Sequence, residues 1–233
     1  MRDQFVGDIG DYAKYSLFNT LAQGRKAGIA WYRTPDQPGP EGNRDSYLRS
    51  ADWAKCDPEV FKCLKHLRTN SARSIAAIEG AGILKAQAFS GRLLELSDIP
   101  VTDRPAWRKE WFQATLSDLA DCNFVFADPD NGLYSDERFS PARKGHLCYT
   151  PLSEARLLAS ERSTMIYHHH GFIQKSHLIH TWRSALGTDT IAIYFGAWGS
   201  RSFFITNPDA PMRQAIAAWA ARWPKVEVFD GHI

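Results

Sequence analysis

The sequence predicts an α/β fold in which a mostly parallel, open sheet carries an antiparallel hairpin near its C-terminal end. Short apolar runs alternate with helical patterns along most of the 233 residues, which is typical of parallel strands joined by right-handed helical crossovers. One run, residues 123–127, is continuously apolar after Asn123, as expected for a strand that is buried on both faces. Together these patterns indicate a Rossmann-like arrangement.

The composition is that of a folded domain, with 44% hydrophobic and 23% charged residues. A chain of this length can bury roughly 70% of the surface that its unfolded form exposes, so we expect one domain over 1–233. The net charge of +2 neither demands nor excludes a nucleic-acid partner. Because the sequence has no long apolar run and no signal-peptide pattern, we expect a cytoplasmic protein without a membrane segment.

The first elements follow from apolar spacing and from helix-starting residues. Apolar residues at helical spacing predict a helix over 11–23, and residues 28–33 predict the first strand. The Pro- and Gly-rich segment 34–43 predicts a surface loop. A helix is expected over 57–67, with Pro58 in its first turn.

The middle of the chain predicts a second strand and a long helix. The apolar run 74–78 is interpreted as that strand, which would place Glu79 at its carboxyl end, and 87–89 as a further short strand nearby. A helix rich in Trp and Arg is expected over 104–119. Its aromatic residues could stack on nucleic acid, but a core-facing stripe with a solvated basic back is favoured.

The last third of the chain continues the alternation and adds the hairpin. The expected elements are a helix over 151–160, a strand over 164–167, a helix over 174–186, strands over 190–196 and 201–206, a helix over 211–222 and a strand over 226–229. The two strands over 190–206 are close enough in sequence to pair as the antiparallel hairpin.

Polar residues follow several of the predicted strands. In open α/β sheets, ligands bind outside the carboxyl ends of the strands. The polar sets at these positions are residues 33–36, Glu79 with Gly80, residues 128–132 and residues 168–171. Four such sets at one edge of the sheet predict a shared pocket.

The turn at residues 128–132 carries two carboxylates and an amide. Asp128, Asp130 and Asn131 are candidate catalytic residues, held by a turn in which Pro129 restricts φ. The same composition is also that of a plain turn, and both interpretations stay open.

Three histidines end the strand over 164–167. Side chains alternate along a strand, so His168 and His170 share one face and His169 takes the other. With Asp128 and Asp130 nearby, a divalent metal site or a general base is chemically possible. A buried, hydrogen-bonded histidine beside exposed ones is the alternative.

The N-terminal segment places acids, glycines and a lysine where a helix begins. Asp11 and Lys14 lie three residues apart on one helical face. The acids would also suit simple capping of the helix. The glycines match no nucleotide-binding loop, so the segment by itself predicts no phosphate site.

Two resemblances follow from these motifs. Residues 4–15, residues 30–36 and the turn at 128–132 resemble a family of bacterial proteins that brings no established activity. The layout also resembles S-adenosylmethionine-dependent methyltransferases, particularly the ribosomal-RNA adenine-N6 group. In that group a Gly-Asn-x-Ala-Asp-x-x-Lys-His segment precedes the first strand, and an Asp-Pro-Pro-Tyr turn follows the fourth.

The second resemblance implies a cofactor, a substrate class and site residues. S-adenosylmethionine would be the cofactor, and a nucleotide or nucleic acid would be the substrate. The resemblance implies cofactor binding by Gly7, Asp11 and Lys14 and a catalytic role for Asp128. Glu79 joins the cofactor-binding candidates because it ends the second predicted strand. Asp130, Asn131 and His169, which follow strands at the same edge, complete the candidate catalytic residues.

The sequence also departs from the methyltransferase pattern. Tyr15 replaces the histidine, and Asp130 and Asn131 replace the proline and the aromatic residue that stacks on a flipped adenine. The glycine-rich turn after the first strand is missing. A metal-dependent hydrolase or nuclease built on Asp128, Asp130 and 168–170 remains an alternative, as does a non-catalytic Rossmann-like binding module.

Overall fold

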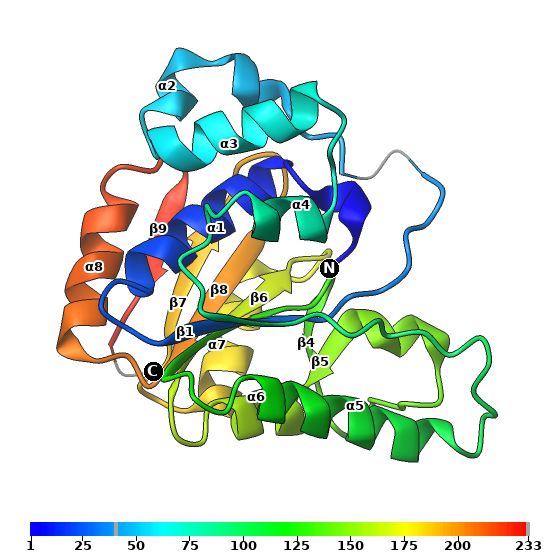
Figure 1. The fold of residues 1–233 in the computed structure, drawn as a ribbon. Helices are drawn as coiled ribbons and strands as arrows, with labels where there is room; N and C mark the ends of the chain where they lie inside the picture. The colour runs from blue at the N-terminus through cyan, green and yellow to red at the C-terminus, as the bar shows by residue number, and fades with distance from the viewer. Residues whose placement is uncertain (40–41, 232–233) are drawn as a thin grey trace.

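The computed structural model describes residues 1–39 and 42–231 and contains one seven-stranded sheet with helices on both faces (Figure 1). In spatial order the strands are β2 (Ala88–Ser90), β1 (Ala27–Trp31), β3 (Phe124–Asp128), β6 (Ser163–His169), β8 (Arg201–Thr206), β7 (Ile191–Phe195) and β9 (Val226–Phe229). Neighbouring strands from β2 to β6 pair in parallel, whereas β8 pairs with β6 and β7, and β7 with β9, in antiparallel fashion. The predicted α/β, Rossmann-like fold with an antiparallel C-terminal hairpin is confirmed.

The strand order reverses between the two central strands. From β1 the chain passes to β2 on one side, and then returns to β3 on the other side. Reversals of this kind leave a crevice at the carboxyl ends of the two central strands, where α/β proteins bind their ligands. Here those ends are Trp31 of β1 and Asp128 of β3, which are register partners.

The helices form two layers, one on each face of the sheet. The first layer contains α1 (Ile9–Leu21), α2 (Ala51–Ala54), α3 (Pro58–Thr69), α4 (Ile75–Gly80) and α8 (Ala210–Ala220). The second layer contains α5 (Arg104–Asp118), α6 (Leu152–Leu158) and α7 (Lys175–Leu186). Each layer packs its own cluster of buried apolar side chains against the sheet.

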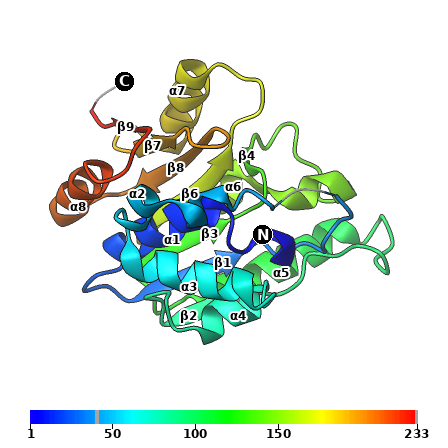
Figure 2. The ribbon, with the colours of Figure 1, turned by 90° about the horizontal axis from the view of Figure 1, so that it is seen from above.

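The first helix is the central element of its layer. It contacts both α3 and α8, and Figure 2 shows it beside them over the sheet. Asp8 caps its N-terminus by accepting a hydrogen bond from the Asp11 N–H at 3.1 Å. Because α1 is covered on nearly all sides, even Asp11 and Lys14 are buried.

Smaller elements join these layers. They are the 3₁₀ helices η1 (Asp3–Phe5), η2 (Ser46–Arg49) and η3 (Lys144–Cys148), and a separate parallel pair of strands, β4 (Gly132–Tyr134) and β5 (Tyr149–Pro151).

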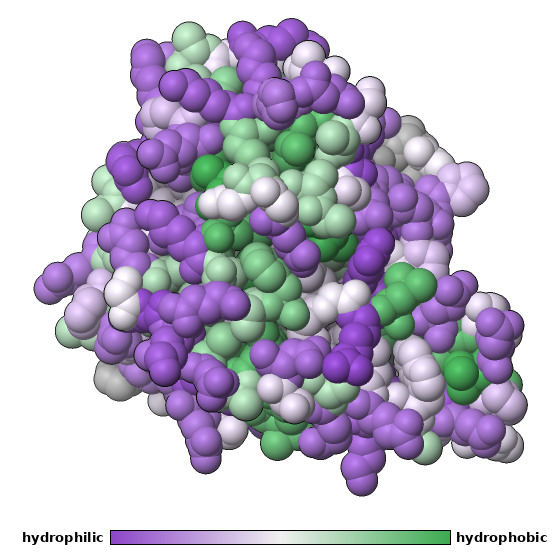
Figure 3. Space-filling model, viewed as in Figure 1, coloured by the Kyte–Doolittle hydropathy of each residue, from purple (hydrophilic) through white to green (hydrophobic). Residues whose placement is uncertain are grey.

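The space-filling view of Figure 3 shows hydrophilic residues around the rim of one face and hydrophobic residues gathered through its middle. Within the described residues, no helix combines the length and the apolar character that a membrane span requires.

One predicted element is wrong. Residues 74–78 do not form a strand but lead into α4, which Ser74 caps by accepting from the Ala77 N–H at 3.0 Å. Ile75 and Ile78 lie three residues apart and bury the same helical face. On the outer side of β1 the neighbouring strand is β2 (Ala88–Ser90), and residues 75–80 belong to α4, so Glu79 does not stand at the end of a strand.

Candidate functional site

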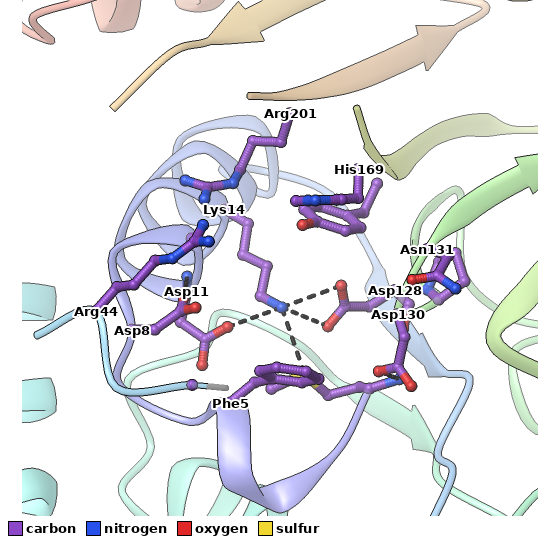
Figure 4. A pocket seen from close by; sticks show the side chains of 15 residues that line it. Phe5, Asp8, Asp11, Lys14, Arg44, Asp128, Asp130, Asn131, His169 and Arg201 are labelled. Atoms are coloured by element: carbon purple, nitrogen blue, oxygen red, sulfur yellow. Dashed lines mark hydrogen bonds and ion pairs between the residues drawn. The ribbon is translucent and has the colours of Figure 1, made fainter. Parts of the chain in front are cut away.

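A cavity of about 240 Å³ lies at the carboxyl ends of β3 and β6, beside the start of α1 (Figure 4). Side chains from the N-terminal segment, α1, the turn after β3, and the facing ends of β6 and β8 line it. Six of the eight site residues expected from the sequence meet there. They are Asp11, Lys14, Asp128, Asp130, Asn131 and His169.

Lys14 stands at the centre of this cavity. Its Nζ lies 2.8 Å from Oδ2 and 3.1 Å from Oδ1 of Asp128, and 2.8 Å from Oδ1 of Asp11. Lys14 comes from one turn inside α1 and Asp128 ends β3, so the ion pair joins the first helix to the central strand. Only 4% of Lys14 is exposed, which removes most of the solvent screening that weakens surface ion pairs.

One ammonium therefore serves two buried carboxylates. Burial alone would lower the pKa of Lys14, but the attraction of Asp11 and Asp128 outweighs it and raises that pKa. Burial raises the pKa of Asp11 to about 7, despite the opposing attraction of Lys14. Lys14 is therefore charged throughout the neutral range, while Asp11 can take up a proton near pH 7.

The crevice between β1 and β3 holds the first residue of the chain. The amino group of Met1 lies 2.5 Å from the Tyr32 carbonyl oxygen, 3.2 Å from the Asp128 carbonyl oxygen and 2.9 Å from Oδ1 of Asp130. Its thioether sulfur lies 3.5 Å from Nζ of Lys14. The crevice thus presents three acceptors that together hold an amino group.

Asp130 is held from the other side as well. Thr34 donates to its Oδ2 at 2.6 Å, and Nε of Arg2 lies 3.1 Å from the same oxygen. Burial would raise the pKa of Asp130, but the Met1 amino group, Thr34 and Arg2 lower it below its usual value. Asp130 is therefore an ionised carboxylate that binds the N-terminal segment, and it also forms part of the cavity wall.

Aromatic and basic side chains complete the cavity. Phe5 lies on the opposite side of Lys14 from His169 and Arg201 (Figure 4). His169 is a register partner of Arg201 across β6 and β8, and its N–H donates to the Asn131 carbonyl oxygen at 3.1 Å. Burial, together with Arg201 and Arg44, lowers the pKa of His169.

Two expected site residues lie outside the cavity wall. Gly7 adopts φ +85°, and its N–H donates to Oδ2 of Asp11 at 3.0 Å, so it positions Asp11 from behind. Glu79 lies on α4 and accepts a hydrogen bond from Nε1 of Trp31 at 2.7 Å, in a separate surface depression. The expectation that Glu79 ends a strand beside the cofactor is wrong because residues 75–80 are helical.

The histidine run alternates as predicted. His168 and His170 are buried and His169 is exposed. Nδ1 of His168 accepts from the Leu133 N–H at 2.9 Å, and Nε2 of His170 lies 2.8 Å from Oγ of Ser202. Burial lowers the pKa values of His168 and His170 to about 3 and about 4, so both are neutral at pH 7.

The histidines and the acidic turn do not assemble a metal centre. His168 packs on Trp182 of α7, on the far side of the sheet from Lys14. Among residues 1–39 and 42–231, no group of three or more His, Cys, Asp or Glu side chains is arranged to hold an ion. The metal site considered for Asp128, Asp130 and residues 168–170 therefore has no geometric support.

The helix α5 uses its aromatic residues for packing, as favoured from the sequence. Trp111 is buried in the core, but Arg108 does not belong to a solvated basic back. The Arg108 guanidinium donates twice to Glu154, at 2.8 Å each, and lies 4.8 Å from the Trp111 ring centroid. A buried arginine is tolerated here because a carboxylate and an aromatic face accompany it.

The cavity residues that were not predicted as site residues include Phe5, Arg44, Tyr167 and Arg201. Arg201 had a usable signal, because it is the single charged residue of a predicted strand and stands at its first position; the structure buries all six residues of that strand. Arg44 had none. It lies in a loop whose position depends on the contact between its carbonyl oxygen and the Ile9 N–H at 3.1 Å.

Comparison with known proteins adds little to this description. No family model and no curated protein matches the chain. The solved structure of protein LPL1258 from Legionella pneumophila strain Philadelphia 1, described under the family model DUF519, is similar over 97% of both chains. The TM-score is 0.49 and the sequence identity is 10%.

Proposed function

We propose that this protein is an S-adenosylmethionine-dependent methyltransferase that acts on a nucleotide or a nucleic acid. The observation that carries the proposal is the buried pair of Lys14 and Asp128 in a cavity beside the strand reversal. A carboxylate at the end of the central strand is placed to hold the acceptor of a transferred group. The resemblance in sequence motifs and the strand order are consistent with this role.

The crevice beside the cavity suits one end of the cofactor. S-adenosylmethionine carries an amino group on its methionyl part, and the carbonyl oxygens of Tyr32 and Asp128 with the Asp130 carboxylate already hold an amino group. Met1 occupies that position at present, so binding requires Met1 to leave. The adenosyl end has no acidic partner at the end of β2, because Ser90 stands there.

When bound, the cofactor supplies an electrophilic methyl group, so the protein needs mainly to position the acceptor. Asp128 accepts a hydrogen bond from the acceptor group, and Lys14, which donates to both oxygens of its carboxyl group, holds it in position. Asp11, on the other side of Lys14, takes up a proton near neutral pH. Phe5 and Tyr167 also line the cavity, so an aromatic residue for stacking on a base is present although the turn at 128–131 lacks one.

Calorimetric titration with S-adenosylmethionine tests the proposal. We expect micromolar binding by the wild type, and loss of binding in Asp130→Asn, which weakens the acceptor set for the amino group. Asp128→Asn should retain binding but abolish transfer of a labelled methyl group to RNA or DNA. Glu79→Gln is the matched control, because it changes a carboxylate outside the cavity and should leave both measurements unchanged.

Two results would contradict the proposal. The first is the absence of cofactor binding by a folded wild-type protein. The second is tight binding of Mg²⁺, Mn²⁺ or Zn²⁺ that Asp128→Asn abolishes, which would favour a metal-dependent hydrolase instead. If neither the cofactor nor a metal ion binds, the interpretation as a non-catalytic binding module is favoured.

A further inference from the structure

Arg201 is a buried cation without a counterion among the described residues. It is 2% exposed and lines the cavity, yet its Nε has no hydrogen-bond partner. Its Nη1 reaches only the Ala197 carbonyl oxygen, at 3.4 Å. In the part of the chain that the structure describes, no carboxylate lies within 4.0 Å of it. The Phe195 ring centroid lies 5.4 Å from Cζ of Arg201, which supplies a cation–π contact but no negative charge. Burying a cation without a counterion is costly, which points to an absent anionic partner.

Arg44 brings a second guanidinium to the same place. It donates to the Trp198 carbonyl oxygen, and it also forms no ion pair with a described carboxylate. A Cβ built on Gly199 would lie 2.3 Å from Nη1 of Arg44 and 3.5 Å from Nη2 of Arg201. The two groups therefore converge on the bare backbone of Gly199, where φ is +118°. Figure 4 shows both on one side of Lys14.

The surroundings do not neutralise this pair. Asp8 also lines the cavity, but it caps α1 and lies farther than 4.0 Å from both guanidinium groups. A Cβ on Gly10 would lie 3.4 Å from Cζ of Arg201, so the arginine packs against the first turn of α1. The amide groups of a helix start favour an anion as well.

We propose that Arg201 and Arg44 form a phosphate-binding site, which takes a phosphate group of the substrate whose acceptor group meets Asp128. Guanidinium groups match phosphate because they donate two parallel hydrogen bonds to its oxygens. Two of them beside Phe5 and Tyr167 suit a base on a ring face with its phosphate at the arginines. The proposal rests on the proposed function for the identity of the substrate as a nucleotide, but not for the binding of phosphate.

The test compares phosphorylated and unphosphorylated probes by calorimetry at constant ionic strength. Inorganic phosphate, AMP, adenosine and a short single-stranded RNA are titrated into the wild type, Arg201→Gln, Arg44→Gln and Arg138→Gln. We expect AMP to bind the wild type roughly tenfold or more tightly than adenosine, and both cavity variants to lose that advantage. Arg138 is exposed and does not line the cavity, so Arg138→Gln should keep it.

The exposed Arg44 keeps the test valid if Arg201→Gln fails to fold, because Arg44→Gln removes a guanidinium without disturbing the core. Equal affinities for AMP and adenosine, or an unchanged preference in Arg44→Gln and Arg201→Gln, would overturn the proposal. Binding of AMP but not of RNA would identify the phosphate group of the substrate as a free phosphomonoester. Tighter binding of RNA than of AMP would identify it as a phosphodiester. Titration with S-adenosylmethionine is a separate measurement. If the cofactor does not bind but the preference for AMP over adenosine is present, the proposed function is contradicted and the phosphate-binding site is not.

Discussion

Replacement of Lys14 by methionine should destabilise the protein strongly. Methionine keeps most of the length of the side chain but removes the ammonium that lies 2.8 Å from both Asp11 and Asp128. Both carboxylates are about 1% exposed, so water cannot replace the lost partner. Removal of one member of a buried ion pair costs about 3–5 kcal/mol, and we expect a loss of that size in the free energy of unfolding.

Urea unfolding followed by circular dichroism, repeated from pH 5 to pH 8, measures this loss. The deficit of Lys14→Met should be largest at pH 8. It should narrow toward pH 5, because the carboxyl groups, left without the ammonium, take up protons in the folded state and so become neutral. The double variant Lys14→Met/Asp128→Asn should recover part of the loss, since it removes one of the two unpaired charges.

Lys55→Met is the matched control. Lys55 forms an ion pair with Asp52 at the same distance of 2.8 Å and the same i,i+3 spacing, but the side chains are 77% and 88% exposed. Because water screens this pair, Lys55→Met should leave unfolding unchanged. If Lys14→Met were as stable as Lys55→Met, or if its deficit did not depend on pH, the account of the cavity as a buried charge cluster would be refuted.

Two further predictions concern the same region. Gly132→Ala should destabilise the fold by roughly 1–3 kcal/mol in thermal unfolding, because a Cβ at φ +102° would lie 2.4 Å from Nδ1 of His168; an unchanged midpoint would contradict this. Asp11→Asn should alter the pH dependence of stability. The pKa of Asp11 rises from 3.8 to about 7 on folding, so this carboxyl group makes the wild type less stable as pH rises from about 4 to about 7. In urea unfolding, the free energy of unfolding of Asp11→Asn should fall less over this pH range than that of the wild type. Parallel pH profiles of the wild type and Asp11→Asn would exclude the raised pKa of Asp11.

Local patterns in the sequence were sufficient for the central part of the fold. The strand β3 was predicted from the apolar residues 124–127, which suit burial on both faces, and these four residues and Asp128 are all buried. The helix α1 was predicted from apolar spacing, but it begins at Ile9 after an Asp8 cap, two residues before the predicted start. Both signals depend on neighbours within a few residues, which a sequence displays directly.

Local patterns failed where two structures share one composition. The run 74–78 is apolar and short, which suits a strand, but the same residues bury Ile75 and Ile78 on one helical face. The Ser74 cap was the signal that could have decided between them. Because the error moved Glu79 to the end of a strand, the expected ribose partner was placed at the wrong site.

The candidate site divides in the same way. The spacing of Asp11 and Lys14 on α1 and the carboxylates of the turn at 128–132 were visible in the sequence, since each group spans a few residues. That Lys14 pairs with Asp128, 114 residues away, and that Arg44 and Arg201 converge at Gly199, depends on how strands and helices pack. Packing is set by contacts between distant segments, and a sequence without its fold carries no direct record of which segments those are.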